Sequence, residues 1–249
     1  MRTTPRRGAI AALAVSSLLF AAACGGSGGS GDKPSDGKQK KESATPSPEA
    51  KPLTRSQAEA AALVLKDMPS GWSQDKSMTD TEDGSTVFGL GKAEKKQCQP
   101  LLDQIVHHPG TPAAQATVAK SYNKSDLGPY LSHGVFSYTA EDALEAMKNS
   151  ALPTGCDKFT VDFEGDKATF TYKKLDVPAV GDETLAWRLI GVDEQDQVPM
   201  QFDFAASRVG SAISVTLLTS VDNKSDTPAF KAAFEKGAQR VAEAVKAAK

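Results

Sequence analysis

The sequence predicts an α+β fold: a single domain with an antiparallel β-sheet covered by helices, carrying one disulfide and preceded by a disordered tether. Segments in which apolar and polar residues alternate follow one another through the second half of the chain, and this is the periodicity of strands. Short turns join several of these segments, which is typical of antiparallel pairing. Amphipathic segments with helical periodicity lie before and after them. The 249 residues, 39% of them hydrophobic, are enough for one well-buried domain.

Residues 1–23 have the pattern of a secretory signal peptide. Arg2, Arg6 and Arg7 form a positive flank, and the apolar stretch 9–23 follows and ends in three alanines. This stretch is shorter than the roughly 20 residues that a membrane-spanning helix needs. We therefore expect export across the cytoplasmic membrane, by either the general secretory route or the twin-arginine route.

Cys24 follows the small residues directly and resembles the cysteine of the bacterial lipobox. The resemblance implies that a diacylglyceryl group is attached to Cys24 and that cleavage makes this residue the new N-terminus. Ala21 stands where the lipobox usually has leucine, so an ordinary signal peptide cut after Ala23 is the alternative. Two acyl chains give stable attachment. We expect the lipid bilayer as a partner and a lipid-anchored location on the extracytoplasmic face of the cell membrane.

Residues 24–53 are assigned to the lipidated cysteine and a disordered linker, and residues 54–249 to an extracytoplasmic domain. The linker is rich in Gly, Ser, Lys, Pro and Glu and has no aromatic residue. Such a segment cannot bury enough apolar surface to offset the entropy of ordering. As a flexible coil it would hold the domain on the order of 30 Å from the membrane.

The charge balance argues against nucleic acid as a partner. The formal net charge is −2, and removal of the three signal-peptide arginines makes it more negative. An acidic surface is a poor counterion for a phosphate backbone. We expect no nucleic acid among the partners.

The first half of the domain mixes helices and strands. Thr54 can cap a helix that runs to Leu65, and Pro69 ends it. Two further helices and two strands are expected before the chain changes to a regular strand pattern. The helices are predicted at 93–106 and 141–151 and the strands near 116–122 and 131–138.

The second half reads as a series of strands closed by one helix. We predict strands at 159–163, 168–172, 185–189, 200–204 and 213–217. The first two are joined by a tight turn and the last two by a hairpin at Gly210-Ser211. A final amphipathic helix carries four apolar residues on one stripe, and we expect the helices to cover one face of the sheet. The stripe consists of Phe230, Phe234, Val241 and Val245.

After Cys24 the chain has only Cys98 and Cys156. In an exported protein a pair of cysteines is most simply a disulfide. A metal site or a redox pair is the alternative, but there is no C-x-x-C motif and no histidine close in sequence to Cys156. The disulfide would stabilise the fold by roughly 4 kcal/mol in the chain-entropy model.

No catalytic constellation stands out, and no cofactor or metal is expected. The pair His107-His108 is interpreted as the polar end of a helix, because adjacent imidazoles on a helix point in different directions. The acidic cluster Asp80, Glu82 and Asp83 lacks the spacing of a calcium loop and is interpreted as a turn. The G-x-S-x-G motif of many hydrolases is absent.

One group of residues is a candidate for ligand binding. Aromatic residues gathered on one face of the sheet can line an apolar cleft, and Arg188 on the opposite side of its strand can face an anionic ligand. The alternatives are a core beneath the helices and a solvated arginine. The aromatic candidates are Trp187, Phe202, Phe204 and Tyr172.

Several short motifs resemble the extracellular sensor domain of PknH-type mycobacterial Ser/Thr kinases, a domain that also occurs in freestanding actinobacterial lipoproteins. They are the helix ending in DMPSGW at 67–72, Cys98 just before a Leu-Leu pair, Val180-Gly181-Asp182 leading into a strand, and the Val209-Gly210 hairpin. The resemblance implies an antiparallel sheet backed by helices and a role in extracytoplasmic sensing. This chain departs from the pattern in having two rather than four cysteines in the domain and no kinase segment.

Three hypotheses of function follow. The first is a binding or sensing module for a small molecule, an envelope component or a protein, and both the absent catalytic motifs and the resemblance favour it. The second is an envelope hydrolase or redox protein, which requires polar residues with perturbed pKa values in a deep pocket. The third is a purely structural envelope protein that has no pocket.

Overall fold

The computed structural model describes most of the predicted domain. The predicted signal peptide, Cys24, most of the tether, the acidic cluster near 80–83 and His108 lie outside the described residues. The description covers residues 51–75, 91–107, 112–193, 197–222 and 224–248.

One antiparallel sheet forms the centre of the described domain, and the predicted α+β fold is confirmed. Its strand order is β1-β3-β4-β9-β8-β7-β6-β5-β2. The strands are β1 (Ser73–Asp75), β2 (Lys92–Ala93), β3 (Ala116–Asn123), β4 (Tyr130–Ser137), β5 (Lys158–Phe163), β6 (Asp166–Lys174), β7 (Glu183–Asp193), β8 (Pro199–Val209) and β9 (Ala212–Val221).

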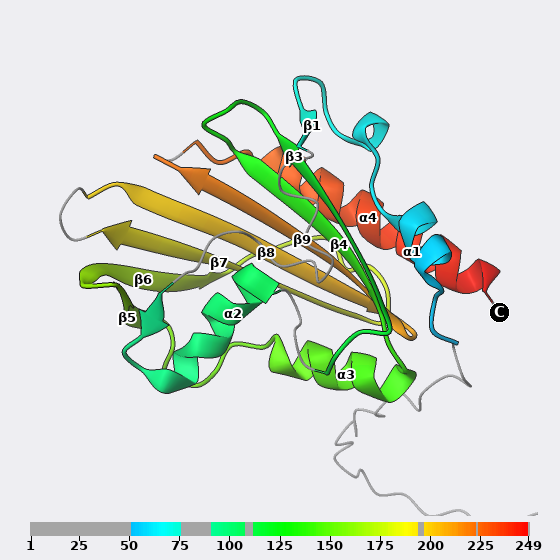
Figure 1. Ribbon diagram of the computed structural model, residues 1–249, viewed down its shortest axis with the longest axis horizontal. Coiled ribbons are helices and arrows are strands. Elements are labelled where there is room, and N and C mark those ends of the chain that lie inside the picture. The colour runs from blue at the N-terminus through cyan, green and yellow to red at the C-terminus, as the bar shows by residue number, and fades with distance from the viewer. Residues whose placement is uncertain (1–50, 76–90, 108–111, 194–196, 223, 249) are drawn as a thin grey trace, which may run out of the picture. The chain divides into compact units, whose positions relative to one another are not determined.

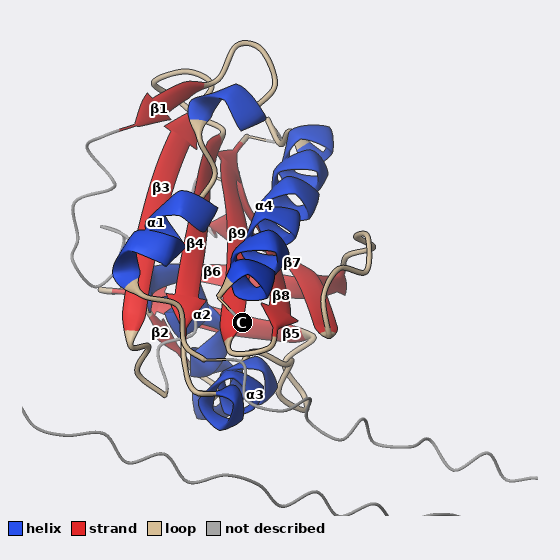
Figure 2. Ribbon diagram, turned by 90° about the vertical axis from the view of Figure 1, so that its right-hand side faces the viewer, coloured by secondary structure: helices blue, strands red, loops and turns tan. Residues whose placement is uncertain are grey.

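Helices pack against both faces of this sheet, not against one face as predicted. In Figures 1 and 2, α2 and α3 lie on one side of the strands and α1 and α4 on the other. Each pair of helices covers its own buried apolar clusters. The helices are α1 (Arg55–Ala61), α2 (Gln99–His107), α3 (Ala140–Asn149) and α4 (Thr227–Ala247), with short 3₁₀ helices at Leu65–Asp67 and Lys96–Cys98.

The second covered face escaped prediction because small residues line it. Along β8, Phe202 and Phe204 point toward α2 and α3, whereas Ala205, the next residue, packs under α4. Ser207 and Ser214 are also fully buried. In an alternating strand, small and hydroxyl side chains predict the solvent-facing side. Here they instead let α4 approach the sheet closely.

The first helix ends earlier than predicted because tertiary hydrogen bonds hold the residues after it in a non-helical conformation. Thr54 caps α1 in a capping box, as expected, but α1 stops at Ala61. Two residues on, the Leu63 N–H donates to Nδ1 of His133, and the Leu63 carbonyl accepts from the Tyr122 hydroxyl at 2.6 Å. Both bonds are buried, so they replace further helical turns.

The other elements follow the sequence closely. The hairpin between β5 and β6 and that between β8 and β9 form as predicted. The second helix begins later than predicted, at Gln99, because Ala93 instead pairs with β5. All four residues of the predicted apolar stripe on α4 are buried.

Cys98 and Cys156 form the predicted disulfide, with 5.5 Å between their Cα atoms. Both cysteines are fully buried. The bond ties the start of α2 to the segment that connects α3 to β5. No helix among the described residues is long and apolar enough to cross a membrane.

Candidate functional site

Arg188 lies on the α4 face and is committed to an internal ion pair. Its Nε and Nη2 donate to the two carboxylate oxygens of Asp203 at 2.5 and 2.6 Å, and Nη2 also donates to Thr227 Oγ1 at 2.9 Å. Asp203 is fully buried. The hydrogen bond to Asp203 raises the pKa of Arg188, against the opposing effect of burial. Its guanidinium therefore anchors α4 to the sheet.

Phe202 and Phe204 belong to the core on the other face. They are 3% and 0% exposed, respectively. Phe204 stacks on Trp187 with 4.6 Å between ring centroids, and Phe202 stacks on Phe170 at 6.3 Å. These two phenylalanines support the wall above them and offer no surface to a ligand.

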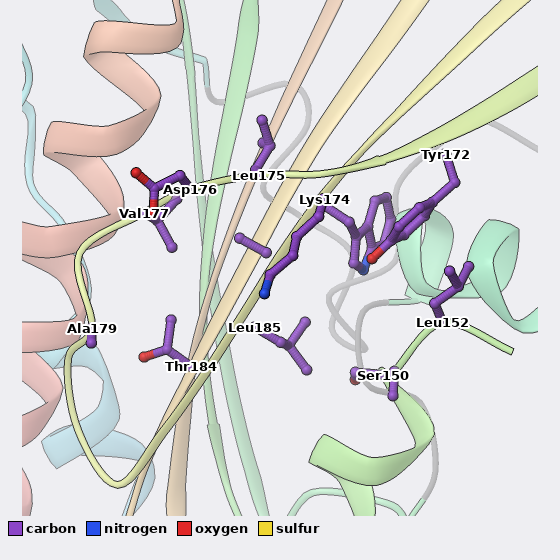
Figure 3. Close-up of a pocket in the computed structure, with 13 residues that line it drawn as sticks. Ser150, Leu152, Tyr172, Lys174, Leu175, Asp176, Val177, Ala179, Thr184 and Leu185 are labelled. Atoms are coloured by element: carbon purple, nitrogen blue, oxygen red, sulfur yellow. The ribbon is translucent and has the colours of Figure 1, made fainter. Parts of the chain in front are cut away.

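A groove of about 410 Å³ lies beside this aromatic core. That volume falls within the range of small-molecule binding sites, roughly 300–1,000 Å³. The end of α3, the last residues of β6, the connection 175–182 and the first residues of β7 form its walls (Figure 3). Its lining is Ser150, Ala151, Leu152, Tyr172, Lys174, Leu175, Asp176, Val177, Ala179, Thr184, Leu185, Ala186 and Trp187.

Local hydrogen bonds hold the connection 175–182 in place. Thr184 Oγ1 accepts from the Val180 N–H at 3.1 Å and donates to the Val180 carbonyl at 2.8 Å. Gly181 has a φ of +79°, and a Cβ added there would lie 2.4 Å from the Arg208 carbonyl oxygen. Only glycine fits this close approach, so the wall of the groove is set by backbone contacts with β8.

The opposite rim is held by α3 and by the disulfide. Ser150 is buried and its hydroxyl donates to the Ala146 carbonyl at 2.9 Å, which closes the end of the helix. Cys156 anchors the segment that follows Leu152. Both rims are therefore fixed independently of any ligand.

Three polar groups of the lining donate no hydrogen bond within the described part of the chain. Trp187 is 1% exposed and its Nε1 has no hydrogen-bond partner. Lys174 has neither an ion pair nor a hydrogen bond within the described residues, and the Tyr172 hydroxyl has no bond there. Figure 3 shows Lys174 reaching across the groove toward Leu185 and the Tyr172 hydroxyl turned inward. Burial, with a smaller effect of the Asp157 charge, raises the pKa of Tyr172.

The structure thus separates the predicted ligand residues. Tyr172 and Trp187 line one groove, with ring centroids 6.4 Å apart. Phe202 and Phe204 lie in the core, and Arg188 is on the far face of the sheet. Lys174 was missed because it ends a strand, where a lysine reads as solvated. The apolar Leu175 and Val177, in a segment without strand periodicity, were the signal that could have indicated a wall.

The described residues contain no group of three or more His, Cys, Asp or Glu side chains placed to hold a metal ion. The polar groups of the groove are those of Lys174, Tyr172, Trp187 and the exposed Asp176, together with the hydroxyls of Ser150 and Thr184. This lining can bind and orient a molecule through apolar contact, hydrogen bonds and one positive charge.

Comparison with known proteins supports the fold alone. No family model matches the sequence, and no curated protein matches it. The structure is similar to the extracellular domain of PknH from Mycobacterium tuberculosis, with a TM-score of 0.54 and 13% identity over 80% of this chain and 99% of that chain. The lipid transfer and protein localization domain of human StarD13 also matches, with a TM-score of only 0.22 and 11% identity over 53% of this chain and 86% of that one. The first similarity confirms the sensor-domain fold that the sequence motifs imply.

Proposed function

We propose that this chain is an extracytoplasmic lipoprotein, anchored through Cys24, whose domain binds a small molecule in the groove between α3, β6 and β7. The observation that supports the binding role is the groove itself, whose walls are fixed by the chain and whose lining combines aliphatic side chains with the exposed Lys174 and the half-buried Tyr172. Small-molecule sites combine apolar walls of this kind with a few polar groups that orient the ligand.

The extracytoplasmic location is supported by three independent features. The basic, apolar and small-residue order of 1–23 favours export, and a cysteine follows it directly. The disulfide between Cys98 and Cys156 suits an oxidising compartment. The fold is shared with a domain that is described as extracellular.

The location is tested by exchanging Cys24 for serine in the natural host and following the full chain through membrane fractionation. We expect the wild-type chain in the membrane fraction and the Cys24→Ser chain in the soluble or secreted fraction. A wild-type mass without acyl chains, or identical partitioning of the two chains, would contradict the lipoprotein assignment.

The binding role is tested with a variant that fills the groove. Ala179 is exposed and lines the groove, so Ala179→Trp should block it without disturbing the core. Ala232→Trp, on the exposed side of α4, is the matched control. Chains purified from host membranes are compared by native mass spectrometry and organic extraction.

We expect a bound molecule in the wild-type and Ala232→Trp chains and none in the Ala179→Trp chain. Equal amounts in all three would place the binding elsewhere. A wild-type chain that carries nothing, and whose Tm does not respond to extracts of the host envelope, would contradict a small-molecule function.

A further inference from the structure

We infer that the groove takes a single-chain anionic amphiphile, meaning an aliphatic body that ends in a carboxylate or phosphate; this inference rests on the proposed binding function. The volume of about 410 Å³ lies near the lower end of the range for small-molecule sites, which favours one chain over a two-chain lipid.

The walls fit an aliphatic body. Leu152, Leu175, Val177 and Leu185 contribute aliphatic side chains from four segments, and the indole of Trp187 adds an aromatic surface. None of these side chains can hydrogen-bond a sugar or a peptide except through the single indole N–H. This part of the wall cannot replace the hydration of a polar group, so it suits the aliphatic segment of a ligand.

The charge of the groove fits an anion. Lys174 extends across the groove, is exposed and has no carboxylate partner in the described chain, whereas Arg188 on the other face is paired with Asp203. The Tyr172 hydroxyl and the Trp187 N–H add two donors beside it. Asp176 is the one acidic lining residue, and Figure 3 shows it next to Val177, away from the ammonium end of Lys174.

The wall of the groove joins the end of the sheet at which the chain enters the described domain. The Lys51 carbonyl accepts from the hydroxyl of Ser211, in the turn between β8 and β9. The connection that forms the groove wall joins the same end of the sheet, because the Asp182 N–H donates to the Arg208 carbonyl at 2.8 Å.

Isothermal titration calorimetry with four probes tests the inference. Dodecanoate, dodecanol and dodecyltrimethylammonium share one chain length and differ in charge, and lauroyl lysophosphatidylglycerol adds a membrane-derived anion. All are used below their micelle concentrations with the full chain carrying Cys24→Ser. Lys174→Met keeps the aliphatic stem and removes the charge. Lys173→Met is the matched control, because Lys173 is exposed and pairs in register with Arg188 on the other face.

We expect the anionic probes to bind more tightly than dodecanol and dodecyltrimethylammonium to bind most weakly. Lys174→Met should weaken dodecanoate binding about fivefold to tenfold and leave dodecanol unchanged. Lys173→Met should change neither. The tighter of the two anionic probes identifies the source as a free acid or a membrane lysolipid.

Two different failures are distinguishable. Equal affinity for the anionic, neutral and cationic probes, or an unchanged dodecanoate affinity in Lys174→Met, would overturn the anionic assignment while the groove remains a binding site. Binding that survives Ala179→Trp, or no binding of any probe, would overturn the proposed site as well.

Discussion

The two faces of the sheet differ in whether their charged side chains are paired. On the α1 and α4 face, the buried Asp203 neutralises Arg188, and Arg240 donates to the carbonyls of Ala60 and Ala61 at the end of α1. On the α2 and α3 face the interior is aromatic and aliphatic, and Lys174 stays without a partner beside a groove. Paired charges hold elements together, whereas an unpaired charge against an apolar wall is available to a ligand. The comparison teaches that the buried cation of the α4 face is matched inside the domain, whereas Lys174 at the groove is not.

The covalent bond on the α2 and α3 face should have the largest effect on stability. The chain-entropy model gives roughly 4 kcal/mol for a closed loop of this length, since the two cysteines have a sequence separation of 58. We expect the double variant Cys98→Ala, Cys156→Ala to lower the free energy of unfolding by about that amount in urea titrations. A loss below about 1 kcal/mol would mean that the packing of α2 and α3 needs no covalent support.

The ion pair on the opposite face should come next. Arg188→Met leaves the fully buried Asp203 carboxylate without its cation, and we expect a loss of about 3 kcal/mol in the free energy of unfolding. The control is Arg55→Met, because Arg55 and Glu59 have side chains 68% and 55% exposed and should contribute almost nothing. Equal losses in the two variants would show that the α4 face does not depend on its internal charge pair.

The close approach of α4 to the sheet gives a third, smaller effect. A Cβ on Gly237 would lie 2.3 Å from Nε2 of His133, whose ring is held by Leu63 and Ser214. We expect Gly237→Ala to destabilise the domain by about 1–3 kcal/mol, although alanine is the better helix former.

A double-mutant cycle with His133→Ala checks the cause of that loss. Removing the ring opens the space, so Gly237→Ala should cost much less in the His133→Ala background than alone. Additive losses would rule out a clash with His133 as the reason.

The smallest effect concerns Tyr122 at high pH. Burial raises the pKa of Tyr122 to about 12, with a smaller contribution from Asp67. The folded state then holds this proton more tightly than the unfolded state, so the stability from this group is complete below the unfolded pKa and is lost as the pH rises toward 12. Tyr122→Phe should lose about 1 kcal/mol at neutral pH and show a flatter decline above pH 10. An unchanged decline would assign the alkaline sensitivity to other groups.

More of the fold than of the candidate site could be predicted from the sequence. Alternating strands, the two hairpins and the α4 stripe were predictable, since each depends on local periodicity and turn chemistry. The end of α1 was not, because it depends on Leu63 reaching His133 and Tyr122 across 59 to 70 residues of chain. The second covered face was hidden for a related reason: Ala205 and Ser214 read as solvent-facing until α4 is placed on them.

The site was partly predictable for the same physical reason. The aromatic residues of β6 and β7 were identified as a group, but periodicity cannot show that Trp187, which is as buried as Phe204, also lines a groove. That distinction depends on the connection 175–182, whose position is set by contacts with β8 and not by its own sequence pattern. Lys174 became a candidate only when its lack of a partner was visible.

Photolabelling with a dodecanoate analogue that carries a diazirine on its chain tests the binding face most directly. After irradiation of the full chain, peptide mass spectrometry locates the label. We predict labels confined to 150–152 and 172–187, absent in Ala179→Trp and retained in Ala232→Trp. Labels that concentrate on α4, or that persist unchanged in Ala179→Trp, would contradict binding in the groove between α3, β6 and β7.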